Sequence, residues 1–212
     1  MTPGRRAGRV TARIAAPVLT RSRRPRRQRR MASRPTDDSA PARGQRDALD
    51  SMRARLSTQL ACLDFAAARI AGLPGPVLEL GLGKGRTYDR IRRIMPDRDI
   101  LVFDLDIHCP PALMPPSDRL FLGDFRDTLR AAGDRVGQVA SMVHADIGSE
   151  DRARDSKLTR DIGPLIDVLV RPEGLVLSDR PLPLPDGNWQ RLPLPPDAAR
   201  TAWPYFIWLR LR

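Results

Sequence analysis

Three glycines at alternate positions, Gly81, Gly83 and Gly85, follow directly on a short apolar run at residues 76–80. Glycine has no Cβ, so a chain with this spacing can turn sharply and its backbone can approach another molecule closely. The next segment, residues 86–95, carries apolar residues at helical spacing and is predicted to be a helix that Pro96 ends. A buried strand, a glycine turn and a helix in this order restrict the fold more than any other feature of the chain.

The rest of the chain continues this alternation of strands and helices. Further strands are predicted at residues 100–103, 120–122, 139–143 and 175–177, and helices at residues 47–71, 125–132 and 157–170. Two last strands, residues 188–192 and 205–211, follow a proline-rich stretch, and the final one is predicted to insert antiparallel into the sheet. Because alternating strands and helices build parallel sheets covered on both faces, we expect an α/β fold. Its sheet is expected to be Rossmann-like, doubly wound, seven-stranded and mostly parallel.

Polar residues stand where three further strands end. Asp104 closes the second strand, Gly123 and Asp124 follow the third, and His144 and Asp146 end the fourth. The carboxyl ends of parallel strands meet at one edge of a sheet, so we expect these residues to line one ligand site. An acid about 20 residues past a glycine loop is where one carboxylate can hold both hydroxyls of a ribose.

The glycine loop does not fit a dinucleotide-binding fingerprint, which requires a third glycine where this chain has Arg86. The pattern from Glu79 to Gly85, acid-x-Gly-x-Gly-x-Gly, instead resembles motif I of the class I S-adenosylmethionine-dependent methyltransferases. The segments VLELGLGKGRTYD and VHADIG are similar to those of small bacterial members of that family. The resemblance implies S-adenosyl-L-methionine as cofactor, methyl transfer as the activity and an antiparallel seventh strand.

The resemblance also implies roles for the strand-end residues. The implied cofactor-binding residues are Glu79, Gly81, Gly83, Gly85, Asp104, Gly123 and Asp124, the implied catalytic residues are His144 and Asp146, and no metal site is expected. Three alternatives stay open. Glu79 contacts the ligand's amino group or only orients the loop, Asp124 is equally suited to cap the helix that begins near Phe125, and His144 is as well suited to a core position as to a base.

The acceptor of the methyl group is not identified by the sequence. A small molecule is the expected acceptor, since no Asn/Asp-Pro-Pro-aromatic motif follows the fourth strand, and residues 178–180 are further candidates for its site. Two other functions compete with methyl transfer. One is an NAD(P)-dependent oxidoreductase on a related sheet, and the other is a non-enzymatic nucleotide-binding module with a nucleic-acid-binding tail.

The net charge of +12 belongs to the amino-terminal tail, residues 1–46, which hold 14 arginines and two acids. The tail is expected to be disordered because it has too few apolar residues to offset the entropy of ordering. It could be a transit peptide, a nucleic-acid-binding arm, or an artefact of start-site choice, with Met31 as the true first residue. Residues 47–212 hold 23 basic and 23 acidic residues and are expected to form the methyltransferase domain, with no attraction to nucleic acid.

Two cysteines, Cys62 and Cys109, are too few for a disulfide framework and have no partners at metal-ligand spacing. No apolar run approaches the roughly 20 residues of a membrane span. The sequence therefore predicts a cytoplasmic protein without a membrane partner, and it does not indicate an oligomeric state.

Overall fold

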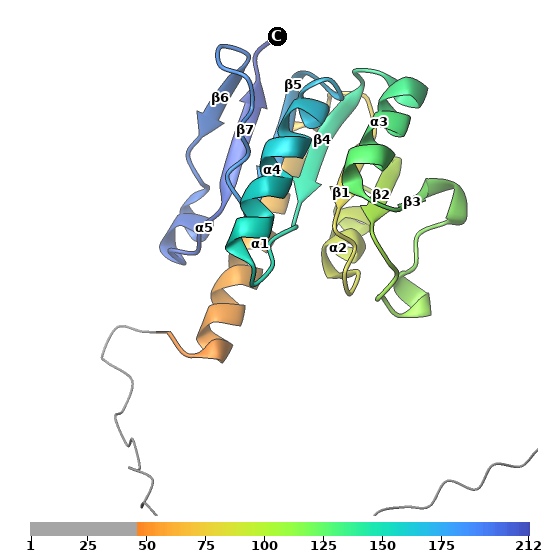
Figure 1. Cartoon of the computed structure of the whole chain (residues 1–212). Coiled ribbons are helices and arrows are strands. Elements are labelled where there is room, and N and C mark those ends of the chain that lie inside the picture. The colour runs from red at the N-terminus through yellow and green to blue at the C-terminus, as the bar shows by residue number, and fades with distance from the viewer. Residues whose placement is uncertain (1–45) are drawn as a thin grey trace, which may run out of the picture. The chain divides into compact units, whose positions relative to one another are not determined.

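The computed structural model describes residues 46–212 of the chain. The strands are β1 (Val77–Leu80), β2 (Ile100–Asp104), β3 (Leu120–Leu122), β4 (Ala140–Ala145), β5 (Val170–Ser178), β6 (Trp189–Leu192) and β7 (Phe206–Arg210). They form one sheet in the order β3-β2-β1-β4-β5-β7-β6 (Figure 1). β1 to β5 pair in parallel, and β7 lies antiparallel between β5 and β6. The expected Rossmann-like α/β fold, with its last strand inserted antiparallel, is confirmed.

The helices cover both faces of this sheet. They are α1 (Ala48–Arg69), α2 (Arg86–Ile94), α3 (Phe125–Val136), α4 (Arg152–Asp167) and α5 (Pro196–Arg200). Successive strand residues point to opposite faces, so Val77 packs with α1, α2 and α5, whereas Leu78 packs with α3 and α4. The result is a helix–sheet–helix sandwich with an apolar layer on each side of the strands.

The helix between β4 and β5, α4, differs from the sequence prediction at both of its ends. α4 begins five residues before the predicted start at position 157, because Asp151 caps it by accepting from the backbone N–H groups of Ala153 and Arg154. Its first turn is mostly exposed and so carries no apolar periodicity. The helix ends at Asp167, and Val170 is the first residue of β5 and not the end of a helix.

The connections after β2 and β5 contain no crossover α-helix. Two short 3₁₀ turns, Pro111–Leu113 and Ser117–Arg119, join β2 to β3, and irregular chain joins β5 to β6. Prolines in both connections lack the N–H group that a helix interior needs. α5, a five-residue helix between β6 and β7, was not predicted.

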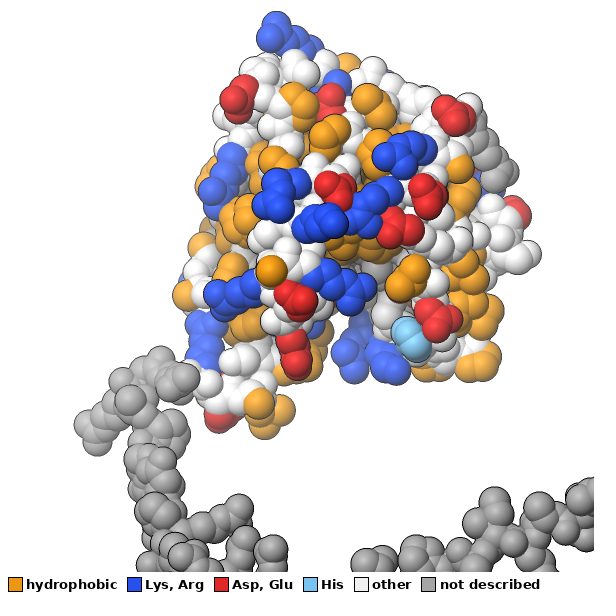
Figure 2. Space-filling model, viewed as in Figure 1, with side chains coloured by type: hydrophobic (Ala, Val, Ile, Leu, Met, Phe, Trp, Pro, Cys, Tyr) orange, Lys and Arg blue, Asp and Glu red, His pale blue; other side chains and the backbone are white. Residues whose placement is uncertain are grey.

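The expected tail, residues 1–46, lies outside the described residues except for Arg46, whose guanidinium donates to the carbonyl of Thr201. The compact unit that contains the sheet comprises Gly44–Arg212. On the face that Figure 2 displays, basic and acidic side chains are interspersed. Within residues 46–212, no helix combines the length and the apolar character that crossing a membrane requires.

Candidate active site

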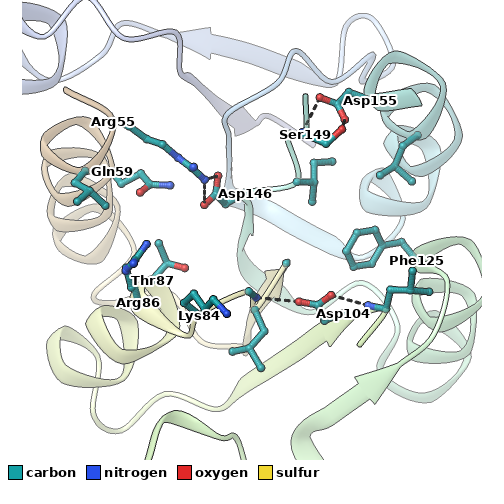
Figure 3. Close-up of a pocket in the computed structure, with 18 of the residues that line it drawn as sticks. Arg55, Gln59, Lys84, Arg86, Thr87, Asp104, Phe125, Asp146, Ser149 and Asp155 are labelled. Carbon is teal, nitrogen blue, oxygen red and sulfur yellow. Dashed lines mark hydrogen bonds and ion pairs between the residues drawn. The ribbon is translucent and has the colours of Figure 1, made fainter. Parts of the chain in front are cut away.

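The carboxyl ends of β1, β2 and β4 form the floor of a pocket of about 410 Å³ (Figure 3). The parallel register sets Leu80 beside Phe103 and Ala145, so the segments that follow these three residues leave the sheet together. α1 forms one wall through residues such as Met52, and α3 and α4 form the opposite wall through residues such as Phe125. Of the residues that the sequence singles out, Gly81, Gly83, Asp104 and Asp146 line this pocket.

Gly81 and Gly83 shape the inner edge of the pocket. Gly81 has φ of 92°, and a Cβ on it would lie 2.6 Å from the carbonyl oxygen of Asp146, so only glycine allows β1 and β4 to leave the sheet this close together. A Cβ on Gly83, where φ is 50°, would meet no atom within 4 Å, and this backbone therefore lies open to a ligand. Gly85 does not line the pocket, and a Cβ on it would lie 2.9 Å from Leu113 Cβ.

Asp104 connects the end of β2 to the glycine loop. Its carboxylate accepts from the backbone N–H of Gly83 at 2.9 Å and from that of Leu105 at 2.7 Å. The backbone N–H of Asp106 adds a longer bond at 3.5 Å, and because a carboxylate has about four acceptor positions, capacity remains for a hydroxyl donor from a ligand. The side chain is fixed by the fold and still lines the pocket, as a ribose-binding acid requires.

Asp146 forms an ion pair with Arg55 across the pocket. Both carboxylate oxygens lie 2.6 Å from the same guanidinium nitrogen of Arg55, which reaches over from α1 (Figure 3). The exposed fraction of the Asp146 side chain is 14%, and that of Arg55 is 34%. The pair therefore lies at the pocket wall, where both groups can contact a bound molecule.

Glu79 and His144 lie behind the pocket and do not line it. Glu79 accepts from the hydroxyl of Thr87 and bonds His144 Nδ1 at 2.6 Å, while His144 Nε2 lies 2.7 Å from the hydroxyl of Tyr205. Glu79 and His144 are fully buried, and Tyr205 is 3% exposed. Both carboxylate oxygens and both ring nitrogens are thus occupied by protein groups, and the contacts expected of Glu79 with the cofactor and of His144 with an acceptor stay predictions.

The charges of this buried cluster are coupled. Burial by itself lowers the pKa of His144, but the charge and hydrogen bond of Glu79, together with the charges of Asp146 and Asp179, raise it above its ordinary value. Burial raises the pKa of Tyr205 well above its ordinary value, and the nearby Asp146 acts in the same direction. The cluster therefore favours a protonated His144 between a carboxylate and a neutral phenol.

Gly123 and Asp124 line an adjoining cavity of about 290 Å³, which shares Leu105, Phe125 and other wall residues with the main pocket. Asp124 is the N-cap of α3 and accepts from the backbone N–H of Arg126 at 2.8 Å. Its carboxylate also pairs with the Arg126 guanidinium at 2.8 Å. The capping role left open for Asp124 is therefore observed, at a position beside the apolar end of the pocket.

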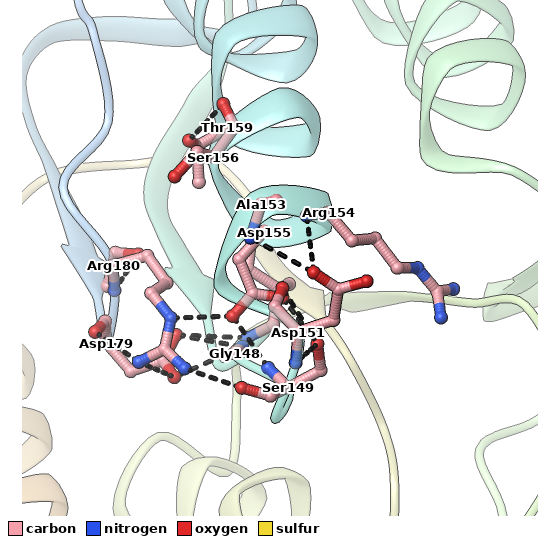
Figure 4. A network of polar contacts seen from close by, with 12 residues as sticks. Gly148, Ser149, Asp151, Ala153, Arg154, Asp155, Ser156, Thr159, Asp179 and Arg180 are labelled. Atoms are coloured by element: carbon pink, nitrogen blue, oxygen red, sulfur yellow. Dashed lines mark hydrogen bonds and ion pairs between the residues drawn. The ribbon is translucent and has the colours of Figure 1, made fainter.

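The loop that follows Asp146 is held by two buried carboxylates (Figure 4). Asp179 accepts from the backbone N–H of Gly148 at 3.1 Å, and Asp155 accepts from both the N–H and the hydroxyl of Ser149. Arg180 donates to Asp155 at 2.8 Å. Burial raises the pKa of Asp179 above its ordinary value, and for Asp155 the bonds from Ser149 and Arg180 outweigh burial and lower the pKa. Asp179 and Arg180, candidates for the acceptor site, thus support the pocket from outside its lining.

Sequence reasoning missed the contribution of α1. Arg55 and Gln59 lie about one helical turn apart on α1, among the apolar residues Met52 and Leu56 that line the same pocket. Polar residues four apart on the inward side of an otherwise apolar stripe are the signal that could have identified them. Nothing in their local sequence indicates which strand end they face.

Comparison with known proteins relates this chain to one family. Residues 46–208 match the family model described as S-adenosyl-L-methionine methyltransferase. A crystal structure of an S-adenosyl-L-methionine methyl transferase from Silicibacter pomeroyi is 40% identical, covers 78% of this chain and 99% of that chain, and superposes with a TM-score of 0.73. A plantazolicin methyltransferase in complex with SAH is 10% identical, with coverage of 76% and 85% and a TM-score of 0.49. A search among curated proteins gave no match.

Proposed function

This chain belongs to the S-adenosyl-L-methionine methyltransferase family, and from that premise we propose that it methylates a small-molecule acceptor bound beside Asp146. Methyl transfer from S-adenosyl-L-methionine is the activity of the family. An oxidoreductase and a non-enzymatic nucleotide-binding module, both compatible with the glycine loop alone, are therefore set aside. The observation that carries the proposal is the pocket along the carboxyl edge of the sheet, with Asp146 at its wall.

The residues of the pocket fit the adenosyl donor. A volume of about 410 Å³ lies within the range of small-molecule sites. The open side of Gly83 and the free acceptor positions of Asp104 suit close approach of a ribose. Leu105, Phe125 and Leu158 supply apolar surface for a flat base, with Asp124 at the adjoining cavity. These observations support the cofactor-binding roles proposed for Gly81, Gly83, Asp104, Gly123 and Asp124.

When bound, the donor supplies a methyl group made electrophilic by the sulfonium. The chain's own contribution is then to hold an acceptor in line with that methyl group and to exclude water, which corresponds to effective molarities on the order of 10⁵–10⁸ M. Asp146 is the proposed catalytic group, because its carboxylate can accept the proton of an acceptor hydroxyl or amine. Arg55 holds this carboxylate in place from α1. We assign His144, Glu79 and Gly85 to positioning roles behind the pocket.

The balance of charge favours a small acceptor over a nucleic acid. Residues 47–212 carry equal numbers of basic and acidic residues, and the two signs are interspersed in Figure 2. A nucleic-acid site needs a basic stripe that neutralises several phosphates.

We also propose a cytoplasmic location, because both cysteines of the chain are free and buried and form no disulfide. Fractionation of cells that express the protein tests this location.

The experiment is methyl transfer from radiolabelled S-adenosyl-L-methionine in a cell extract separated into small molecules, RNA and protein. We expect the purified protein to label the small-molecule fraction, and Asp146→Asn to reduce that labelling by about 10²–10⁴-fold. Titration with S-adenosylhomocysteine checks that the variant still binds the donor's product. Label that enters only RNA or protein contradicts the proposed acceptor class. Failure of the wild-type protein to bind the product contradicts the function itself.

A further inference from the structure

Arg55 has N–H groups at the pocket wall that no protein group uses. One guanidinium nitrogen, Nη2, pairs with both carboxylate oxygens of Asp146 (Figure 3). The other two, Nε and Nη1, have no hydrogen-bond partner within residues 46–212, and 34% of the side chain is exposed. Because a guanidinium carries five N–H donors, Arg55 is able to bind a second anion while it still holds Asp146.

The other charges that line the pocket make its surroundings positive. Arg86 and Arg154 line it and pair with no carboxylate in the described part of the chain. The acids that line it, Asp104, Asp146 and Asp155, are all bonded to protein donors. A bound methyl donor adds a further positive charge, that of its sulfonium. These charges attract a negatively charged acceptor and repel an aliphatic amine, which is protonated near neutral pH.

The inward face of α1 continues past the sheet as an exposed apolar surface. Leu63 and Ala66 on this face are buried in the core. Met52, about three turns nearer the amino end, lines the pocket and is nevertheless 43% exposed, and Leu49, about one turn further, is 80% exposed. Figure 1 shows these first turns of α1 projecting beyond the carboxyl ends of the strands. Exposed apolar side chains that continue a pocket are typical of a surface that contacts a ligand.

We propose that the methyl acceptor is a small carboxylic acid with an apolar body and a hydroxyl group as its nucleophile. Its carboxylate binds the free N–H groups of Arg55, its hydroxyl faces Asp146, and its apolar body packs on Met52. The proposal rests on the proposed function, since it assigns the substrate class of the same site. The proposed donor contacts, from Gly81 to Asp124, follow β1, β2 and β3, so the part of the pocket at the end of β4 is left for this acceptor.

Arg55 is thus the residue that determines specificity, because it recognises a group that does not react. The hydroxyl oxygen forms a bond to the methyl carbon while the carbon–sulfur bond breaks. The electron pair of that bond goes to sulfur, and the hydroxyl proton goes to Asp146. The carboxylate is unchanged, and the product is a methyl ether that is still an acid.

The first test fractionates the small molecules of a cell extract before the methyl-transfer assay. Acceptor activity should be retained by a strong anion exchanger at neutral pH and released by salt. It should then pass into an organic solvent at about pH 2, where a carboxyl group is protonated, and stay in water at about pH 8. Phosphate and sulfate esters stay in water under both conditions, so this step distinguishes a carboxylic acid from other anions.

The second test uses variants of α1 with the acid fraction as acceptor. Arg55→Lys keeps a positive charge beside Asp146 but replaces the guanidinium by a single ammonium. The amount of the fraction that gives half the maximal rate should therefore rise about tenfold. Met52→Ser removes apolar surface and should raise this amount about threefold. The matched control is Leu60→Ser, at a side chain of α1 that is 46% exposed and does not line the pocket, and it should change nothing.

Acceptor activity that passes through the anion exchanger, or that stays in water at acid pH, overturns the proposal. An unchanged half-saturating amount in both variants overturns it too, as does a loss of affinity for S-adenosylhomocysteine in Arg55→Lys, which would assign Arg55 to the donor. A variant that unfolds is recognised by its thermal midpoint, and the other variant then decides the outcome. If no small-molecule fraction accepts label, the proposed function fails before the acceptor class is tested, so the two failures are distinguishable.

Discussion

At Gly81 the chain leaves β1 with a left-handed backbone and passes the carbonyl oxygen of Asp146 so closely that a methyl group does not fit. Gly83, two residues on, also has positive φ but faces open space. The two glycines thus serve different purposes. Gly81 allows two strand ends to converge, whereas the proposed role of Gly83 is to leave room for the donor.

Substitution of each glycine by alanine should distinguish the close approach at Gly81 from the open backbone at Gly83. Gly81→Ala should lower the free energy of unfolding by at least about 2 kcal/mol, because strain in φ adds to a steric overlap with backbone. Gly83→Ala should cost about 1 kcal/mol, since only the left-handed conformation is penalised. Urea denaturation measures both values. If the two variants lose the same free energy of unfolding, the close approach at Gly81 does not contribute to stability.

The Glu79–His144–Tyr205 cluster predicts a dependence of stability on pH. The folded state holds the His144 proton more tightly than the unfolded state does, because the pKa of His144 is raised above its ordinary value of 6.5. The stabilisation is therefore complete below about pH 6.5 and is lost as pH rises through the folded-state pKa. Glu79→Gln removes the charge that raises this pKa. It should cost roughly 1–3 kcal/mol at pH 6 and less at pH 9.

Urea denaturation of the wild-type protein and of Glu79→Gln between pH 6 and pH 9 measures this difference. A control, His108→Gln, removes a histidine whose side chain is 61% exposed, and it should leave the slope of the wild-type curve unchanged. A cost of Glu79→Gln that is the same at both ends of the pH range would contradict a charged His144 in the folded protein.

At the scale of elements, α4 is joined to the pocket by the polar loop that precedes it. Asp151 caps the helix, and one turn later Asp155 binds Ser149 and Arg180. The first contact stabilises only the helix, while the second also fixes a loop that lines the pocket. We therefore expect the beginning of α4 to influence both stability and ligand binding, through different residues.

Two substitutions separate these effects. Asp151→Ala should lower stability by about 1 kcal/mol and leave the affinity for S-adenosyl-L-methionine unchanged, because only a cap is lost. Arg180→Met leaves the buried Asp155 without its cation and should cost roughly 1–3 kcal/mol while it also weakens donor binding. Denaturation and calorimetric titration measure the two quantities. Unchanged donor affinity in Arg180→Met would contradict the role of this network in shaping the pocket.

Element positions followed well from sequence where the local pattern was strong. β1, β2, β3 and α2 were predicted to within a residue or two at each end, because apolar runs and glycine or proline boundaries coincide there. α4 and α5 were misplaced or missed. The first turn of α4 is polar and α5 is only five residues long, so neither has an apolar period of its own.

For the whole molecule, the boundary before α1 is a prediction that truncation can test. The compact unit begins at Gly44 and the family match at residue 46. A chain that starts at Gly44 should keep the thermal midpoint and the donor affinity of the full chain. A chain that starts at Gly72 should not fold, because it loses Cys62, Leu63 and Ala66 from the core. Lower donor affinity in the first truncation would mean that residues 1–43 take part in binding.

The sequence by itself determined the order of strands and helices, the glycine loop and the acids at the strand ends, because these depend on periodicity and on turns a few residues long. Only the tertiary structure decided which of those side chains reach the pocket. Strand register turns Glu79 and His144 into the interior, while Asp104 and Asp146 stay at the edge. Packing of α1 brings Arg55 within 2.6 Å of Asp146, 91 positions away, and sets Gln59 above α2. Contacts across such separations depend on how helices dock on the sheet, and no local pattern encodes that docking.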